Sequence, residues 1–410
     1  MTAENHSALA SKTFRVYLLG NIFSVLGIWV QRLALGWQAW ALSESALVVG
    51  LVAAAQFMPT IFFTPFFGVI VDRINAKSGA IVMHVIMTTI AFALGVLTFS
   101  GGMNVEWLLG LALANGIANS AYAPIRLALI PDLVTKKQFP SAAAMTATIF
   151  NLSRFVGPGV GGAIVALYGL GYAYIVNAVT YVPVIFALLW IRIDAHKPEH
   201  VGPTDYFGQL KEGIRYTWDH ALIFQLILLT GVSNFFGRGL LELMPAFAAL
   251  IFEGGSSVLA ALMSAIGLGA ITASLLLSLR SLQHRLRMVA FTGAIGAGVS
   301  IALFGTVENL PAGIAAAAML GMFASLVSIS SQTEIQLQVE NRLRGRVMSL
   351  WSLVIMGAPA LGSVLGGSLA GSIGPTPTSF AFAVGCLGLV ALLTLRGRTR
   401  HTVGAGQVPD

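Results

Sequence analysis

Charged residues are scarce in this chain, and their scarcity excludes most soluble folds. Only 10% of the 410 residues are Asp, Glu, Lys or Arg, whereas soluble domains contain about 25%. A soluble protein of this length needs far more polar surface around its core. Carboxylates are the rarer sign, with 16 Asp and Glu against 23 Lys and Arg, so the formal net charge is +7. The basic residues are dispersed over short loops, which argues against a nucleic-acid interface.

Cysteine is scarcer still, and the motifs of several chemistries are missing. Cys386 is the only cysteine, so no intramolecular disulfide can form. No Gly-x-x-x-x-Gly-Lys-Ser/Thr loop occurs, which excludes ATP as an energy source within this chain. His196 and His200 are four apart, but Pro198 breaks the helix that would align them as metal ligands. We find no nucleophile–base motif either, and therefore expect no enzyme activity, cofactor, metal or nucleotide.

Hydrophobic residues make up 56% of the chain and occur in long runs. A membrane-spanning helix needs about 20 mostly apolar residues, and twelve stretches meet this requirement. They lie at roughly 14–41, 46–71, 79–99, 105–129, 141–167, 171–192, 220–250, 256–279, 288–307, 310–333, 346–370 and 377–396. The sequence predicts an all-α membrane protein with twelve transmembrane helices.

Basic residues precede the first span and follow every second span, and they predict the orientation. They include Lys12, Arg15, Lys136, Lys137, Arg285, Arg287, Arg342, Arg344, Arg346 and Arg398. The opposite loops carry Glu44, Glu106, Glu253 and Glu308 and almost no Lys or Arg. The positive-inside rule places both termini in the cytoplasm, as an even number of spans also requires. The polar first residues lack the pattern of a cleaved signal. We expect a multi-pass protein of a bacterial-type cytoplasmic (inner) membrane.

The only long polar stretch, 193–219, divides the chain near its middle. It separates a six-helix half at 1–192 from a second at 220–396, and 397–410 forms a cytoplasmic tail. Apolar residues recur within the stretch at helical spacing and predict an interfacial helix, with its aromatic side toward lipid. They are Tyr206, Phe207, Leu210, Ile214 and Trp218.

The two halves resemble each other at an offset of about 205 positions, most clearly at the glycine pairs 161–162 and 366–367. Six spans per half insert both halves the same way up, as two pseudo-symmetric bundles related by an axis along the membrane normal. Such an arrangement places a substrate site between the halves near the midplane.

Three arginines and one carboxylate lie deep inside the spans. Arg32 and Arg238 occupy equivalent places in the two halves, and Arg154 lies in the fifth span. A charge in the bilayer core costs ~3 kcal/mol or more and persists only where protein or water solvates it. Glu242 follows Arg238 by one turn, as an i,i+4 pair. We expect these residues to line a shared cavity. Alternatively, Arg32, Arg238 and Glu242 form a structural gate near the outer mouth, and Arg154 bonds to helix carbonyls beside Pro158.

Glu242 is the candidate for proton coupling, because it is the only carboxylate placed firmly inside a span. Burial favours its protonated form, whereas a neighbouring Arg238 favours the carboxylate unless the pair separates during transport.

Amide side chains in the spans are further candidates for the cavity. Most amides in membrane helices bond to a neighbouring helix, and the remainder would line the cavity together with aromatic residues. The amides are Gln31, Gln38, Gln56 and Asn234, and the aromatic residues are Trp29, Trp37, Phe57, Phe235 and Phe236. A cavity of amides, rings and arginines suits an amphipathic or anionic compound.

The segment GVIVDRINAK at 68–77 resembles the loop motif of the major facilitator superfamily: Gly, three residues, Asp-Arg and further basic residues. The matching residues are Gly68, Asp72, Arg73 and Lys77, and Lys77 alone remains of the further basic residues. The resemblance implies that Asp72 stabilises the outward-open state through charge contacts at the cytoplasmic helix ends.

The segment FNLSRFVGPGVGG at 150–162 resembles the Gly-Pro-x-x-Gly-Gly signature of exporters in this superfamily, through Gly157, Pro158, Gly161 and Gly162. Glycines allow helices to touch and proline kinks a span, so we expect a conformational role. A narrower resemblance is to the enterobactin-exporter-like branch. It is carried by PIRLALIPDLV (124–134), VENRLRGRVMSL (339–350) and GAPALGSVLGG (357–367).

These patterns predict a secondary active transporter that exports a small amphipathic or anionic compound, siderophore-like or drug-like, by proton antiport and alternating access. Its partners would be the cargo, protons and membrane lipid, with no nucleic acid. Two alternatives stay open. A lipid flippase would admit its cargo sideways through a groove between the halves, and a metabolite importer would use the same fold.

Overall fold

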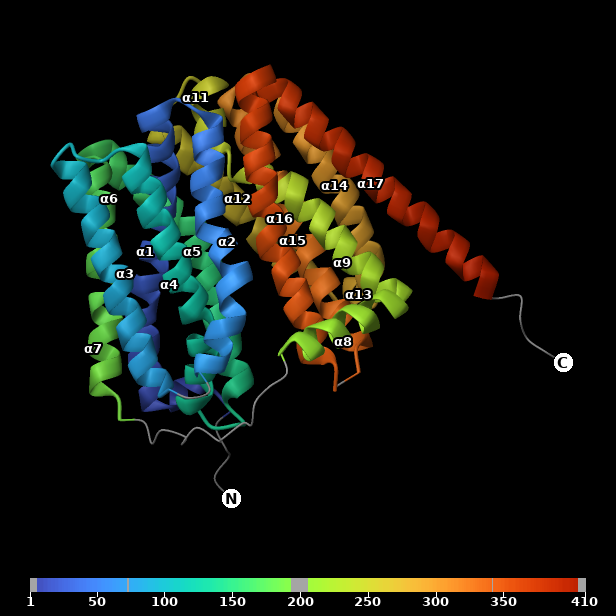
Figure 1. The fold of residues 1–410 in the computed structure, drawn as a ribbon, viewed down its shortest axis with the longest axis horizontal. Coiled ribbons are helices and arrows are strands. Elements are labelled where there is room, and N and C mark those ends of the chain that lie inside the picture. Colours follow the sequence, from blue (N-terminus) through green and yellow to red (C-terminus); the bar gives the residue numbers. More distant parts are fainter. Residues whose placement is uncertain (1–5, 72–73, 193–205, 341, 405–410) are drawn as a thin grey trace.

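The computed structural model describes residues 6–71, 74–192, 206–340 and 342–404. Within these ranges the chain is built of helices and contains no strand. Twelve helical segments are long and apolar enough to cross a membrane, and they form two bundles side by side (Figure 1). The predicted all-α membrane fold with twelve spans is therefore confirmed.

The first half contains the first six spans. They are α1 (Lys12–Ser43), α2 (Ala46–Val71), α3 (Ala76–Phe99), α4 (Val105–Asp132), α5 (Phe139–Tyr168) and the pair α6 (Leu170–Thr180) and α7 (Val182–Trp190). Polar residues begin several of them: the side chains of Ser11, Asn75 and Asn104 accept hydrogen bonds from the backbone of the first turns of α1, α3 and α4. The sixth span is interrupted at Tyr181.

The second half begins with an interrupted span. The elements are α8 (Tyr206–Asp219), α9 (Ala221–Ser233), a π turn (Asn234–Arg238), α10 (Gly239–Leu241), α11 (Met244–Leu250), α12 (Ser256–Leu277), α13 (Arg280–Gln283), α14 (Leu286–Thr306), α15 (Leu310–Gln338), α16 (Arg344–Ile373) and α17 (Pro375–Gly404). The seventh span, expected at roughly 220–250, is present as Ala221–Leu241, and the chain departs from α-helical geometry twice in the expected range, at the π turn and between Leu241 and Met244.

The two halves repeat the same packing. In the first half α1 packs on α5, α2 on α4 and α3 on α6. The equivalent pairs in the second half are the π turn and α10 on α16, α12 on α15, and α14 on α17. Each helix therefore has a counterpart six spans later in the chain, as a pseudo-twofold axis requires.

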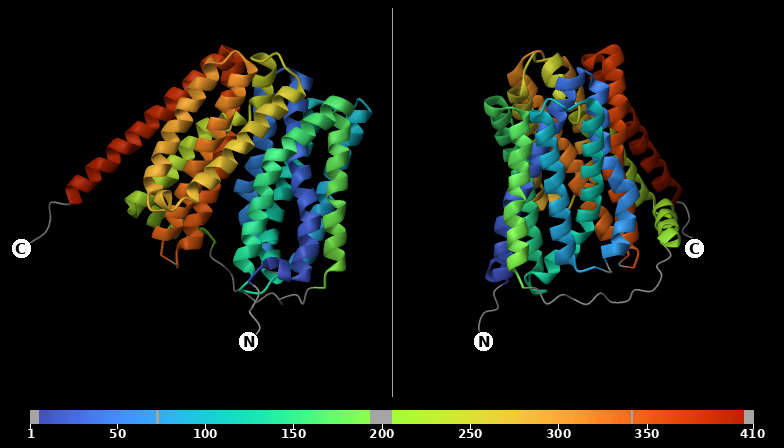
Figure 2. Two further views of the ribbon diagram at one scale, coloured as in Figure 1. Left: turned by 180° about the vertical axis from the view of Figure 1, so that it is seen from behind. Right: turned by 60° about the vertical axis from the view of Figure 1, so that its left-hand side comes forward.

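The halves meet along two helix pairs, α2 with α16 and α5 with α12. Small residues make the contact close: the Ser363 hydroxyl donates to the Gly50 carbonyl at 3.1 Å, and Gly367 faces the Ala46 carbonyl. These contacts lie toward the end of the molecule that carries α11, and the bundles diverge toward the end where α1 begins (Figures 1 and 2). In the last turns of α2 the side chains of Phe62 and Phe66 are exposed.

Replacing Gly162 by valine is expected to separate the halves at the end where they touch. Gly162 in α5 faces α12, and an ideal Cβ at this position would lie 2.2 Å from the Cβ of Ala260. Two side-chain carbons cannot approach so closely, so α5 and α12 must move apart. The variant should therefore populate a state in which the α11 ends of the two bundles lie further from each other.

Distances between spin labels can measure this shift. Glu106 and Glu308 are exposed at that end of the molecule, Glu106 in the first turn of α4 and Glu308 just before α15, and Cys386→Ser removes the native thiol. Double electron–electron resonance on Glu106→Cys/Glu308→Cys should show a longer component in Gly162→Val. Gly388→Ala serves as the control, because no atom lies within 4 Å of its added Cβ. An identical distance distribution in both variants would contradict the expectation.

The stretch between the halves contains α8, which lies beside the start of α16 (Figure 1). Glu212 forms ion pairs with Arg342, at 3.5 Å, and with Arg346. Ile214 and Trp218 are exposed. An amphipathic helix is therefore present where one was expected, and its contact with lipid stays a prediction. The side chains of Tyr206, Phe207 and Leu210 lie outside the described part of the structure.

Candidate functional site

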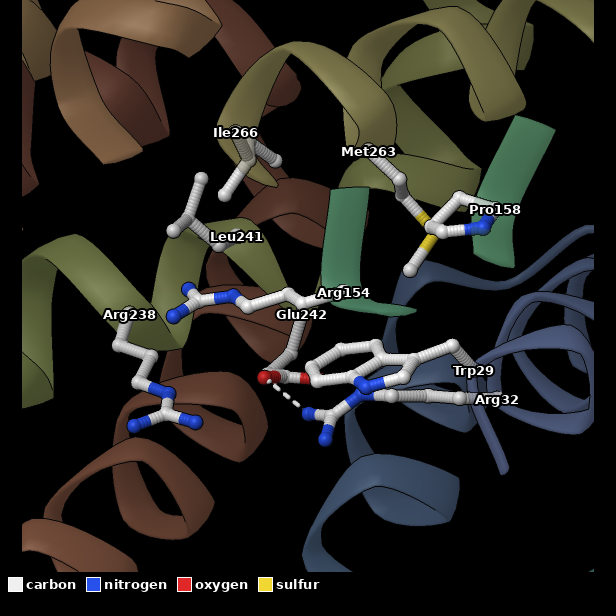
Figure 3. A pocket seen from close by; sticks show the side chains of 9 residues that line it. All are labelled: Trp29, Arg32, Arg154, Pro158, Arg238, Leu241, Glu242, Met263 and Ile266. Atoms are coloured by element: carbon white, nitrogen blue, oxygen red, sulfur yellow. Dashed lines mark hydrogen bonds and ion pairs between the residues drawn. The ribbon is translucent and has the colours of Figure 1, made fainter. Parts of the chain in front are cut away.

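A pocket lies between the two halves and is lined by both (Figure 3). Its charged residues are Arg32 from α1, Arg154 from α5, and Arg238 and Glu242 from the interrupted seventh span. The wall is completed by Trp29, Pro158, Leu241, Met263 and Ile266. The structure thus brings together the four charged residues that are expected deep inside the spans, Arg32, Arg154, Arg238 and Glu242.

Glu242 forms an ion pair across the boundary between the halves. Its Oε1 lies 2.6 Å from Nη2 of Arg32, and the two side chains are only 13% and 20% exposed. The i,i+4 spacing predicts Arg238 as the partner of Glu242, and that prediction is wrong: no ion pair joins these two residues in the described structure. In Figure 3 the Glu242 carboxylate points toward Arg32, and the Arg238 guanidinium lies apart from it.

The backbone around Glu242 is irregular on both sides. Residues 234–238 form a π turn before it, and Pro245, the second residue of α11, lacks the N–H that would bond to the Leu241 carbonyl in a continuous helix. The turn from Arg238 to Glu242 is itself α-helical, because the Glu242 N–H bonds to the Arg238 carbonyl at 3.2 Å. The two residues therefore keep their i,i+4 spacing, and the Glu242 carboxylate nevertheless pairs with Arg32 of the other half.

Arg154 and Arg238 line the same pocket, and no carboxylate pairs with either among the described residues. Because Glu242 neutralises Arg32, two guanidinium charges remain in a partly buried site. A buried charge is costly unless it is paired. Arginine binds carboxylates and phosphates through two parallel N–H···O bonds. The pocket is therefore suited to an anion supplied from outside the chain.

The ring of Trp29 lies against two of these arginines. Its centroid is 5.4 Å from Cζ of Arg32 and 5.8 Å from Cζ of Arg154. The Phe57 ring lies 4.8 Å from Cζ of Arg32. Contacts of this kind between a cation and an aromatic face stabilise each pair by ~0.5–2 kcal/mol.

The amide residues expected in the cavity do not line this pocket. Gln31 accepts a hydrogen bond from Asn177 at 2.6 Å inside the first half, and Gln38 donates to a threonine of α3 at 3.0 Å. Gln56 and Asn234 donate to carbonyls four residues earlier in their own spans. Helix-to-helix bonding, the alternative considered for such residues, describes Gln31 and Gln38.

The glycines of the exporter signature bring α5 against two other helices. Gly157 faces α1, and a Cβ there would lie 2.4 Å from the Cβ of Trp29. Gly161 also faces α1, and a Cβ added there would lie 3.2 Å from Cα of Val30. Gly162 faces the other half. These residues thus set distances between helices, and one of them sets the position of a pocket residue.

The second half repeats this arrangement without the proline. Gly362 and Gly366 of α16 face the seventh span, and Gly367 faces α2 of the other half. Ser363 occupies the position equivalent to Pro158, and α5 continues as one helix through that proline.

Two residues of the loop motif, Asp72 and Arg73, lie outside the described residues. Gly68 belongs to the last turns of α2. Lys77 lies at the start of α3, and its Nζ donates to the Ile191 carbonyl at 2.6 Å. Lys77 thereby ties the start of α3 to the end of the sixth span, and the gating role of the motif stays a prediction.

Three residues that line the pocket could not be identified from the sequence. Leu241, Met263 and Ile266 are apolar residues in apolar spans, and no pattern separates them from positions that face lipid. Arg126 is a different omission: it lies inside α4, and its Nε is buried without an acceptor in the described structure. The sequence alone could have identified Arg126 as a candidate, because it is a charged residue within a span.

Comparisons with known proteins agree with this architecture. A family model described as transmembrane secretion effector matches residues 3–408. The staphyloferrin A transporter of Staphylococcus aureus is 26% identical over 363 residues, which cover 86% of this chain and 88% of that protein. The enterobactin exporter EntS of Escherichia coli is 25% identical over 391 residues, covering 93% and 91%.

A solved structure supports the fold alone. It is a bacterial homologue of the human lysosomal transporter Spinster, in an inward-facing and unoccupied conformation. It matches with a TM-score of 0.72 at 16% identity, over 95% of this chain and 98% of that chain.

Proposed function

The chain belongs to the transmembrane secretion effector family of major facilitator transporters, and from that membership we propose that it exports a small anionic compound. The observation that carries the proposal is the pair Arg154 and Arg238, two cations in a pocket between the halves that have no carboxylate partner among the residues the structure describes. The relatives named above transport staphyloferrin A or export enterobactin. A siderophore-like anion is accordingly the first cargo to test.

The ion pair between Arg32 and Glu242 supports coupling to protons. While it is closed, it links the two halves and holds the empty carrier in one state. A cargo anion that binds Arg32 opens the pair. A proton on Glu242 also opens it, because a neutral carboxyl attracts the guanidinium far less. The carrier then changes state with cargo or with a proton, and not when empty, which is the requirement for antiport.

The movement proposed is a rocking of the halves at 1–192 and 220–396 about the α2–α16 and α5–α12 contacts. The loop charges favour cytoplasmic termini in a bacterial-type inner membrane. In that orientation the halves touch toward the outside and diverge toward the cytoplasm. Asp72 would stabilise the opposite, outward-open state, as the loop motif implies.

Efflux from cells tests this function. Metabolites are compared inside and outside cells with and without the gene, and the comparison is repeated with a protonophore. Export predicts that one or more anions are retained inside when the gene is deleted. Unchanged efflux after collapse of the proton gradient would remove the antiport mechanism, and an anion depleted inside on deletion would instead indicate an importer.

A second candidate, lipid transport, has one observation in its favour. A groove between α5 and α12 is lined only by small residues: Gly159, Gly162, Ala163, Ala166, Ser257, Ala260, Ala261 and Ser264. Such a groove on the flank of the interface could accept an acyl chain. Movement of a fluorescent phospholipid between leaflets of proteoliposomes would support this candidate over a water-soluble cargo.

A further inference from the structure

Trp29 carries a polar group for which the ion-pair mechanism has no role. The residue is only 6% exposed, and its indole Nε1 is buried with no hydrogen-bond acceptor among the described residues. Buried donors are almost always paired, because an unpaired donor loses its bonds to water without replacement. Trp29 also lines the pocket between the halves, so an acceptor on the cargo can complete the bond.

The ring is held in place from several sides. The edge of Phe150 packs against it, with ring centroids 5.6 Å apart. Gly157 gives the Trp29 Cβ the space that any larger residue would occupy. Figure 3 shows the ring between the side chains of Arg32 and Arg154, in keeping with the distances to both guanidinium groups. The position of the indole N–H is therefore fixed relative to the cationic groups of the pocket.

This arrangement places one neutral donor beside fixed positive charges. A guanidinium that contacts an aromatic ring keeps other N–H groups free to bind a carboxylate in two places. A carboxylate satisfies the guanidinium groups but leaves the indole N–H unpaired. An anion with a hydroxyl oxygen beside its carboxylate satisfies both, because that oxygen can accept from Nε1.

We propose that Trp29 is a specificity-determining residue, which selects carboxylates that carry a neighbouring hydroxyl. The proposal rests on the proposed function in that it takes the pocket to be the cargo site. A carboxylate with a neighbouring hydroxyl occurs in aliphatic and in aromatic compounds. Citrate represents the aliphatic compounds and salicylate the aromatic ones. Tricarballylate and benzoate are the same molecules without the hydroxyl.

Binding to the full-length protein in nanodiscs tests the selection. Isothermal titration of the wild type should show citrate bound about tenfold more tightly than tricarballylate, the effect of one hydrogen bond to a fixed donor. Salicylate against benzoate decides whether the aromatic source is also accepted. Trp29→Phe keeps a ring and removes the N–H, so the tenfold ratio of the two affinities should fall to about one.

A second variant moves the ring without changing its chemistry. Gly157→Ala places a methyl group against the Trp29 side chain, so the hydroxyl preference should fall there as well. Gly388→Ala adds a methyl group where nothing lies within 4 Å, and it should keep the wild-type ratio.

The outcomes separate this inference from the proposed function. If Trp29→Phe keeps the hydroxyl preference while Arg238→Gln loses binding, the pocket is the cargo site and the role of Trp29 is refuted. If Trp29→Phe weakens citrate and tricarballylate equally, its role is structural and the selection is also refuted. If no probe binds the wild type at millimolar concentration, the selection fails, whereas efflux of another anion would still support export.

Discussion

Glu242→Gln is expected to abolish uphill, proton-driven transport and to leave downhill equilibration of the cargo intact. Glutamine keeps the shape of the side chain but carries no charge at any pH, so its attraction for Arg32 no longer holds the empty carrier. With one proton exchanged for one cargo molecule, each pH unit sustains about a tenfold gradient. The ratio should fall to about one in the variant. Staphyloferrin A accumulation in inside-out vesicles with an imposed pH gradient measures it.

Two controls distinguish loss of the ion pair from general damage. Glu308→Gln removes a carboxylate from an exposed position outside the pocket and should keep the tenfold gradient. Arg32→Glu/Glu242→Arg restores an ion pair with its charges exchanged, across the 2.6 Å contact of the wild type. The double variant should recover a gradient that Arg32→Glu alone lacks. Full accumulation by Glu242→Gln would remove Glu242 from the coupling mechanism.

The fold could be predicted from the sequence because its signals are local. The length of an apolar run sets a span, and the span expected at 288–307 is α14, Leu286–Thr306. Polar helix caps act over a few residues, as Asn309 does at the start of α15. The pseudo-twofold axis is visible in the glycines: Gly162 and Gly367 correspond in sequence, and each faces the opposite half.

The pairing inside the pocket could not be predicted from local signals. The i,i+4 spacing of Arg238 and Glu242 is present, because the Glu242 N–H bonds to the Arg238 carbonyl, but the Glu242 carboxylate forms its ion pair with a residue of another helix. The actual partner, Arg32, is separated from Glu242 by half of the chain, so only the docking of the two halves brings them together. Gln31 shows the same limit, because its bond to Asn177 depends on the packing of α1 against α6. Residue type identified the charged candidates, and tertiary packing decided their partners.

Arg154→Gln and Arg238→Gln are each expected to weaken cargo binding by about 10- to 100-fold. Each arginine lines the pocket and has no carboxylate partner in the described part of the chain, and a hydrogen bond to a charged group is worth ~1.5–3 kcal/mol. Arg154→Lys and Arg238→Lys keep the charge but lose the planar fork, so their affinities should lie between wild type and glutamine. Isothermal titration with staphyloferrin A and citrate measures the dissociation constants.

The control and the double variant make this prediction specific to an anion held by both arginines. Arg15→Gln removes the same charge from an exposed position at the start of α1, and it should bind cargo as the wild type does.

If one carboxylate group bridges Arg154 and Arg238, the first substitution already breaks the bridge. The double variant should then lose less than the two single effects combined. Independent contacts to two anionic groups would give additive losses, which identifies a cargo with at least two charges. Wild-type affinity in both single variants would mean that the anion binds elsewhere, and the pocket would lose its assignment as the cargo site.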